Sequence, residues 1–307
     1  MAAETAKLFG HVKDSDYFHV PEFMGFHYDR LHLNLGTPGE QHVDFQLAKF
    51  EGTHYYGPRL TMDLFDWHVD FQVTKFMVLE VVAALLMIVI FVWLARKIRT
   101  GERPRGIVWN LFEAMVVFLR DEVARPAIGR HDADRFLPYI WTIFFFILFC
   151  NLLGLVPWAG SPTGAWGCTL VLAAMTLVTV MGAGMGKYGV GRFFVGQVPH
   201  MDVPLVMKIF IWPMVFVIEL FGMGIRHFVL SVRLLANMFA GHLVLAVILG
   251  FIAATADRNV AIWSTVMASS VFGAIALSLL ELFVAFLQAY IFAFLSALFI
   301  GMAVHQH

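Results

Sequence analysis

Charge is scarce in this chain of 307 residues: only 14% of the residues are charged, whereas 60% are hydrophobic. Soluble domains carry about 25% charged residues, so this composition argues against a soluble enzyme of one or two domains. The net charge is −1 and no basic block stands out, which argues against nucleic-acid binding. Charge is rarest after residue 136, where the acidic residues are Asp202, Glu219, Asp257 and Glu281. This scarcity of charge indicates that the chain after residue 136 is embedded in a membrane.

Several chemical signatures are also absent. The only cysteines, Cys150 and Cys168, lie in or beside apolar stretches and indicate neither a disulfide framework nor a CxxC site. The sequence has no HExxH and no GxSxG motif, which argues against a membrane metalloenzyme or hydrolase. We therefore predict no cofactor and no metal. No cleavable signal peptide is evident at Met1–Gly10.

Residues 1–74 are polar, and we predict a water-facing, extracytoplasmic N-terminal tail with short elements. The tail holds seven of the 13 histidines: His11, His19, His27, His32, His42, His54 and His68. Their spacing matches no metal site, so we interpret them as surface residues. A metal-binding or proton-collecting role stays open as the alternative.

Residues 75–307 are predicted to form the membrane domain. Apolar runs long enough to cross a bilayer core of about 30 Å indicate membrane helices at 75–95, 137–157, 168–186, 213–253 and 261–302. Residues 107–130 mix apolar and charged residues, as an amphipathic helix at the membrane surface does. We therefore expect an all-α polytopic membrane protein with about five membrane-embedded helices and one amphipathic surface helix.

The last two apolar segments are unusually long. A helix of roughly 41 residues would be about 60 Å long, twice the hydrocarbon thickness. Each segment is therefore either two spans or one steeply tilted helix. Because the second segment contains no proline, we favour a long, steeply tilted C-terminal helical hairpin.

Lysine and arginine collect on one side of this arrangement. The stretches 96–136 and 187–212 hold nine and three of them, whereas 158–167 holds none and 254–260 holds one. Positive residues mark the cytoplasmic side. We therefore expect the N-terminus outside and the C-terminus in the cytoplasm.

Charged residues inside the long segments follow a seven-residue spacing. Glu219, Arg226 and Arg233 lie seven apart, and so do Glu281 and Gln288. Seven residues are almost two helical turns, so each set shares one side of its helix. Asn237 continues the first stripe, whereas His242 lies about opposite Arg233 and faces the partner helix.

These residue types indicate proton chemistry around a fixed charge. Arginine does not release its proton in proteins, whereas His and Glu can relay protons. Plain alternatives stay open: Arg226 at the interface, Glu219 as its partner, and His242 with Glu281 as a buried hydrogen-bonded pair.

The segment Ser231–His242, SVRLLANMFAGH, resembles the signature of subunit a of F-type ATP synthases. Glu281 to Phe292 resembles the second half of that signature, and Asn151–Pro157 resembles the family's second-span motif. The resemblance covers about residues 76–303. It departs from the family at Gly154, where many bacterial members have an aspartate.

The resemblance implies that this chain is the proton-channel stator subunit beside a rotating c-ring. Arg233 matches the essential arginine that faces the c-ring carboxylate. The outer half-channel matches Asn237, His242, Glu281 and Gln288. Glu219 matches the acid of the inner half-channel, and Arg226 matches a supporting basic position.

The resemblance also implies partners: c-ring proteolipid subunits, b-type peripheral stalk subunits and, indirectly, the soluble ATPase head. The expected location is an energy-transducing membrane, most simply a bacterial inner membrane. The chain alone is not expected to be an enzyme. The main rival is a secondary transporter with an ionisable site at the midplane, but such folds often show inverted repeats and broken helices, and the sequence shows neither.

Overall fold

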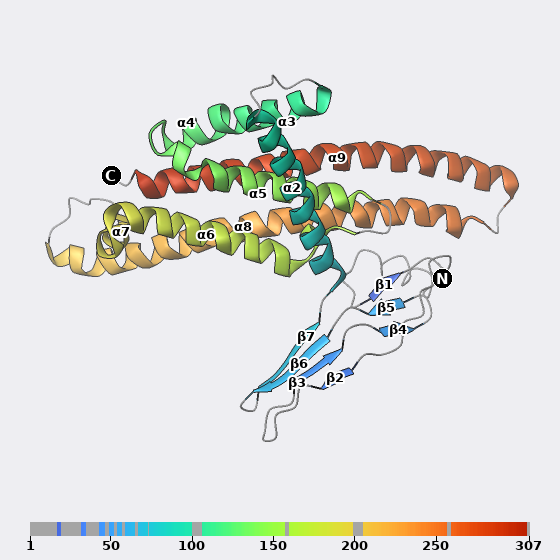
Figure 1. The fold of residues 1–307 in the computed structure, drawn as a ribbon, viewed down its shortest axis with the longest axis horizontal. Helices are drawn as coiled ribbons and strands as arrows, with labels where there is room; N and C mark the ends of the chain where they lie inside the picture. Colours follow the sequence, from blue (N-terminus) through green and yellow to red (C-terminus); the bar gives the residue numbers. More distant parts are fainter. Residues whose placement is uncertain are drawn as a thin grey trace.

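The structure is a computed structural model. It describes residues 17–19, 32–34, 43–46, 49–51, 54–56, 59–64, 67–72, 74–99, 106–156, 160–198, 205–256 and 259–305. Figure 1 shows a long group of helices with two small sheets near the start of α2 (Lys75–Arg99).

Five helices are long and apolar enough to cross a membrane. They are α2, α5 (Ala133–Gly154), α6 (Trp166–Tyr188), α8 (Leu205–Ala254) and α9 (Val260–Val304). In lipid every backbone polar group needs a partner within the protein, and a helix supplies it. The predicted all-α polytopic membrane fold is confirmed for the described residues from α2 onward.

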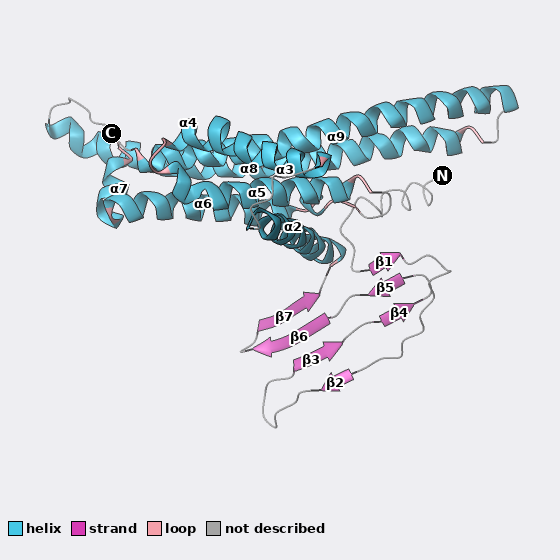
Figure 2. Cartoon of the chain, turned by 45° about the horizontal axis from the view of Figure 1, so that its top comes forward, coloured by secondary structure: helices cyan, strands magenta, loops and turns pink. Residues whose placement is uncertain are grey.

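The C-terminal hairpin consists of two unbroken helices. α8 has 50 residues and α9 has 45, so they are about 75 Å and about 68 Å long at 1.5 Å per residue. They lie side by side, and the ends next to the turn between them extend beyond the other helices (Figures 1 and 2). Of the two sequence alternatives, one long helix per segment is the one that the structure adopts.

Shorter helices lie beside these spans. The predicted amphipathic surface helix is α3 (Ile107–Phe118), the π-helical segment η2 (Leu119–Ala124) and α4 (Arg125–Ile128) in succession. Pro126 is the second residue of α4 and lacks the N–H that a continuous α-helix would use, which fits the wider turn before it. A 3-10 turn, η3 (Pro162–Gly164), precedes α6, and α7 (Val190–Gly196) follows it.

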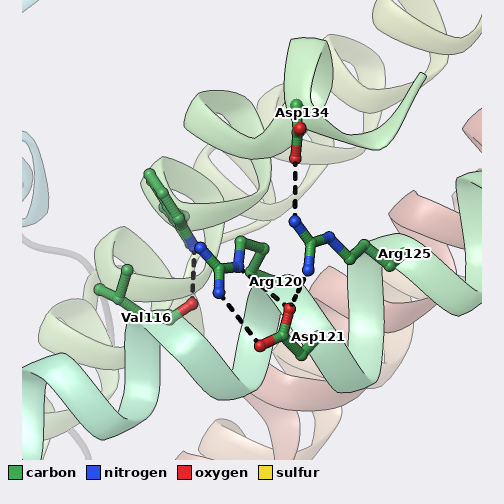
Figure 3. Close-up of polar contacts among 6 residues, drawn as sticks. Val116, Arg120, Asp121, Arg125 and Asp134 are labelled. Carbon is green, nitrogen blue, oxygen red and sulfur yellow. Dashed lines mark hydrogen bonds and ion pairs between the residues drawn. The ribbon is translucent and has the colours of Figure 1, made fainter. Parts of the chain in front are cut away.

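The surface helix is tied to α5 by polar contacts (Figure 3). Asp121 accepts hydrogen bonds from Arg120 at 3.0 and 3.2 Å and from Arg125 at 2.7 Å. Arg125 also approaches Asp134 of α5 at 3.9 Å. The hydrogen bond from Arg120 is the main reason that the pKa of Asp121 is lowered, so Asp121 stays ionised and holds both arginines.

The core of the helical part centres on α5. Eleven of the 22 residues of α5 are buried, compared with 13 of the 45 residues of α9. Ile140, Phe145 and Ile147 of α5 are almost fully buried and belong to one hydrophobic cluster. α5 packs against α2 and against α9. The hairpin is therefore anchored mainly through the C-terminal part of α9, where most of the buried residues of that helix lie.

The chain before α2 contains β-strands. β1 (Tyr17–His19), β5 (His54–Tyr56) and β4 (Lys49–Glu51) form one antiparallel sheet in this order. β2 (His32–Asn34), β3 (Val43–Gln46), β6 (Arg59–Leu64) and β7 (Trp67–Gln72) form the other. The prediction for this region gave short elements without a type. Its histidines His11, His27 and His42 lie outside the described residues.

Candidate functional site

The predicted stripe of charges lies on a single helix, α8. Arg226 Nη2 and Glu219 Oε2 are 3.9 Å apart, and both side chains are partly exposed. Arg233, two turns further along, is half-buried. Within the described part of the chain, no carboxylate forms an ion pair with Arg233. Arg226 thus has an acidic partner in the chain, whereas Arg233 has none among these residues.

One turn beyond Arg233, a polar pair joins the two long helices. Asn237 Nδ2 of α8 donates a hydrogen bond to Gln288 Oε1 of α9 at 2.9 Å. Gln288 is only 2% exposed. Its Nε2 has no hydrogen-bond partner among the described residues. The structure therefore brings together two predicted residues that are 51 positions apart.

Glu281 reaches α8 at Gly241. A Cβ added to Gly241 would overlap the Glu281 carboxyl, so glycine is what lets this carboxyl lie against the backbone of α8. His242, the next residue, is half-buried, and its Nε2 has no partner among the described residues. No hydrogen bond between His242 and Glu281 is formed there. The Glu281 carboxyl therefore lies close to the α8 backbone beside His242, and the alternative of a His242–Glu281 hydrogen bond is not what the described residues form.

A second group of buried polar residues lies where α5 and η3 meet α9. Thr163 Oγ1 donates to Asn151 Oδ1 at 2.7 Å and lies 2.7 Å from Ser161 Oγ. Asn151 Nδ2 donates to the carbonyl oxygen of Ala285 at 3.3 Å. Ala285 is one turn from Glu281 on α9. We call Asn151, Ser161 and Thr163 the hydroxyl–amide cluster.

Gly154 has a packing role in this cluster. A Cβ at this position would clash with the side chain of Ser161, so the glycine lets the segment before α6 lie close to the end of α5. An aspartate here, as the resemblance suggests for other family members, would need a different arrangement of Ser161.

The sequence did not point to two titratable positions that face the bundle, Glu80, which is half-buried, and His227, which is buried. Glu80 is the only charged residue between Lys75 and Arg96, and that isolation was the available signal. His227 of α8 is 3% exposed; its Nδ1 lies 2.8 Å from the carbonyl oxygen of Met223, and its ring centroid is 4.9 Å from that of Phe299. The seven-residue spacing did not indicate His227, because that spacing runs through its neighbour Arg226.

No group of three His, Cys, Asp or Glu side chains in the part of the chain that the structure describes could hold a metal ion. The groups gathered between α8 and α9 are instead a carboxyl, an imidazole, two amides and a guanidinium. Carboxyl and imidazole groups can bind and release protons, and the guanidinium keeps its charge. The polar groups of α8 and α9 therefore include two that can exchange protons and one fixed positive charge.

Comparisons with known proteins point to one family. The family described as ATP synthase A chain matches residues 77–301. ATP synthase subunit a of Myxococcus xanthus is 42% identical over 228 residues, which cover 73% of this chain and 71% of that protein. The subunit a of an Anaeromyxobacter species is 38% identical over 309 residues, 98% of this chain and 71% of that protein. That of Chloroherpeton thalassium is 41% identical over 209 residues, covering 68% and 59%.

Proposed function

Since the chain belongs to the ATP synthase A chain family, and is thus a multi-pass membrane subunit of the F-type ATP synthase, we propose that it conducts protons through two offset half-channels. In this proposal each half-channel opens to one side of the membrane and leads to the carboxylates of a c-ring. Proton flow through them drives rotation of the ring and ATP synthesis. Each proton that crosses contributes about 2.3 kcal/mol per 100 mV of membrane potential.

The outer half-channel runs between α8 and α9. Protons from the outer side reach Glu281 and His242, pass the amide pair of Gln288 and Asn237, and neutralise a c-ring carboxylate. The support for this path is that these side chains line one interface: the Glu281 carboxyl packs against Gly241, and Asn237 is hydrogen-bonded to Gln288. A neutral carboxyl can enter lipid, where a charged one would be costly.

The inner half-channel includes Glu219. After nearly a full turn of the ring, the c-ring carboxyl releases its proton near Glu219, with Arg226 as a supporting charge. The 3.9 Å contact between Arg226 and Glu219 supports this grouping. Both side chains are more than a third exposed, so the pair contributes little to stability and its charges remain open to water and protons.

Arg233 separates the two half-channels. Its positive charge favours the ionised form of a nearby carboxylate, and it cannot carry a proton across. The observation that carries the proposal is the position of Arg233 on α8, between the Glu219–Arg226 pair and the Asn237–Gln288 pair, without an acidic partner among the described residues. The c-ring carboxylate would be that partner.

The test is Arg233→Lys in the assembled complex, with ATP-driven proton pumping measured in inverted vesicles. Lysine is a point charge that loses its proton more readily when buried, so we expect pumping to be lost. Arg226→Lys is the matched control: it keeps a cation for Glu219 and should reduce pumping far less. Wild-type pumping by Arg233→Lys would refute the role.

A second test concerns His242 and Glu281. Exchanging them, His242→Glu with Glu281→His, keeps both titratable groups at the same interface, because the Glu281 carboxyl lies beside the residue that precedes His242. The double variant is expected to pump better than either single variant. A double variant no better than the poorer single would show that the two groups do not act together.

The remaining assignments complete the proposal. The partners are c-ring proteolipids, b-type peripheral stalk subunits and, indirectly, the soluble ATPase head, and the chain performs no catalysis alone. The membrane is a bacterial inner membrane, with residues 1–74 outside and the C-terminus in the cytoplasm. Co-purification with a small hairpin proteolipid and protection of residues 1–74 from protease in inverted vesicles test these assignments together.

A further inference from the structure

The buried side of α2 carries a carboxyl group. Phe76, Ala83 and Leu94 are the buried hydrophobic residues of this helix, and Met87 and Phe91 pack against the core. These positions follow the helical spacing of three, four or seven residues, and Glu80 falls on the same stripe, one turn after Phe76. Glu80 therefore faces the helix bundle, although it lies within a membrane-spanning segment.

The carboxyl of Glu80 lies on the side of α2 that packs against α5. The Glu80 carboxyl acts electrostatically on the thiols of Cys168 on α6 and Cys150 on α5, in agreement with its place on the inward-facing stripe of α2. α2 also contacts η3, the turn that contains Thr163. Among the described residues, these two thiols are the titratable groups that face Glu80 from α5 and α6.

From this junction, buried polar groups continue toward the proposed outer half-channel. Asn151 follows Cys150 directly on α5 and bonds to Thr163 of η3. On its other side Asn151 donates to the carbonyl of Ala285, one turn from Glu281. Asn151 and Thr163 are fully buried, and Ser161 is 2% exposed. Ionisable side chains inside a membrane mark ion pathways, and Ser, Thr and Asn side chains between membrane helices form hydrogen bonds; here the two kinds of group adjoin.

We propose that Glu80 is an additional proton-binding carboxyl of the outer half-channel, which takes protons from outer-side water and supplies them through the hydroxyl–amide cluster to Glu281. This inference rests on the proposed function. Glu80 is five residues into α2, about 8 Å along the helix, at the end that the orientation places outside.

The transfer needs only proton exchange between oxygen atoms. A hydronium ion protonates a carboxylate oxygen of Glu80 and leaves as water. The proton then passes to water or a hydroxyl beside the cluster, and Ser161 and Thr163 can each accept one proton while giving up another. Glu80 returns to the ionised form. The Asn151 amide does not relay protons, so the proton moves as a hydronium ion through water beside the cluster, protonates a carboxylate oxygen of Glu281 and leaves water behind.

The decisive variant is Glu80→Gln in the assembled ATP synthase, reconstituted in vesicles. Glutamine keeps the shape and the polarity of the side chain, but its amide does not bind a proton near neutral pH. The rate of ATP synthesis per complex should fall about tenfold, less than the 10²–10⁴ typical of an obligatory acid–base group, since water can still reach Glu281. The dependence of the rate on outer pH should also change, and Glu80→Asp should restore both rate and pH dependence. A wild-type rate and outer-pH profile in Glu80→Gln would overturn the inference.

A second pair of variants keeps the inference testable if Glu80→Gln prevents assembly. Thr163→Val keeps the size of the side chain but removes the hydroxyl, whereas Thr163→Ser keeps it. The inference predicts a slower rate for the valine variant and recovery with serine. Equal rates in both would overturn the path through the cluster.

The Arg233→Lys variant distinguishes a failure of the Glu80 inference from a failure of the proposed function. Loss of pumping in Arg233→Lys combined with normal synthesis in Glu80→Gln would refute only the role of Glu80. Normal pumping in Arg233→Lys would refute the proposed function itself, whatever Glu80→Gln does.

Discussion

The two halves of α9 differ sharply in burial, although they belong to one continuous helix. In residues 260–284, which we call the exposed half, Ser270 is the only buried residue. In residues 285–304, the buried half, twelve are buried. The buried half presents small residues every three or four positions, among them Ala285, Ala289, Ala293 and Ala297, and packs against α4, α5 and α6.

The buried half therefore anchors the helix to the bundle, whereas the exposed half serves the function of the hairpin. Small side chains let helices approach closely in a membrane, and the buried half uses them to fix the hairpin to the bundle. The exposed half contacts mainly α8 and presents large apolar residues such as Phe272 and Phe283 to its surroundings. Glu281 and Gln288 lie at the border between the halves. On one side of this border the helix is packed against the bundle, and on the other side its surface is available to a partner.

The largest expected contrast is between two phenylalanines of α9. Phe292 in the buried half is fully buried, whereas Phe272 in the exposed half is 76% exposed. Phe292→Ala should destabilise the protein by about 3–5 kcal/mol because it leaves a cavity, whereas Phe272→Ala should change stability by less than about 0.5 kcal/mol. Thermal unfolding of both variants in detergent measures this. Equal losses of stability in the two variants would contradict the proposed difference between the halves.

Two glycines give a smaller contrast of the same kind. A Cβ at Gly301 would overlap the carbonyl oxygen of Ala127 in α4, whereas a Cβ at Gly250 of α8 meets nothing within 4 Å. Gly301→Ala is expected to cost about 1–3 kcal/mol through overpacking, and Gly250→Ala should be neutral or slightly stabilising because alanine favours the helix. The same unfolding assay applies. A stable Gly301→Ala protein would mean that α4 moves away from α9 at little cost.

The smallest effect is expected at the border itself, for the hydrogen bond between Asn237 and Gln288. A double-mutant cycle with Asn237→Ala and Gln288→Ala should give a coupling of about 0.6 kcal/mol, the average for such bonds between membrane helices. ATP-driven pumping should fall more than this coupling implies, since the amides are proposed to line a proton path. Loss of stability without loss of pumping would leave the pair a structural link only.

The helical fold could be predicted from the sequence because apolar runs in lipid have few alternatives to helices. The strands were harder, although Trp67–Gln72 alternates apolar and polar residues as a half-buried strand does. That signal is short and lies in a polar region, where neither composition nor hydropathy assigns a structure. The π segment before Pro126 depends on local hydrogen bonding, which a hydropathy pattern does not contain.

The site was partly predictable for a similar reason. The spacing of Glu219, Arg226 and Arg233 follows from helix geometry alone, and the resemblance supplied the partner positions on α9. The cluster around Asn151 could not be predicted, because it joins α5, η3 and α9 across 134 positions of sequence. Glu80 was visible as a lone acid, but only the packing of α2 determines that it faces inward.

The hydrogen bond from Asn151 to Ala285 has a consequence for the synthesis of the protein. Asn151 enters the membrane with α5, and its acceptor is made only after α6, α7 and α8 have followed. Lipid can cover the apolar side of α5 in the meantime, but it offers no acceptor for an amide. Thr163, which is made soon after α5, binds the amide oxygen, while the amide nitrogen must rely on water or the insertion machinery until α9 arrives. The late docking of α9 thus completes the bundle and satisfies the last donor of its central helix in one step.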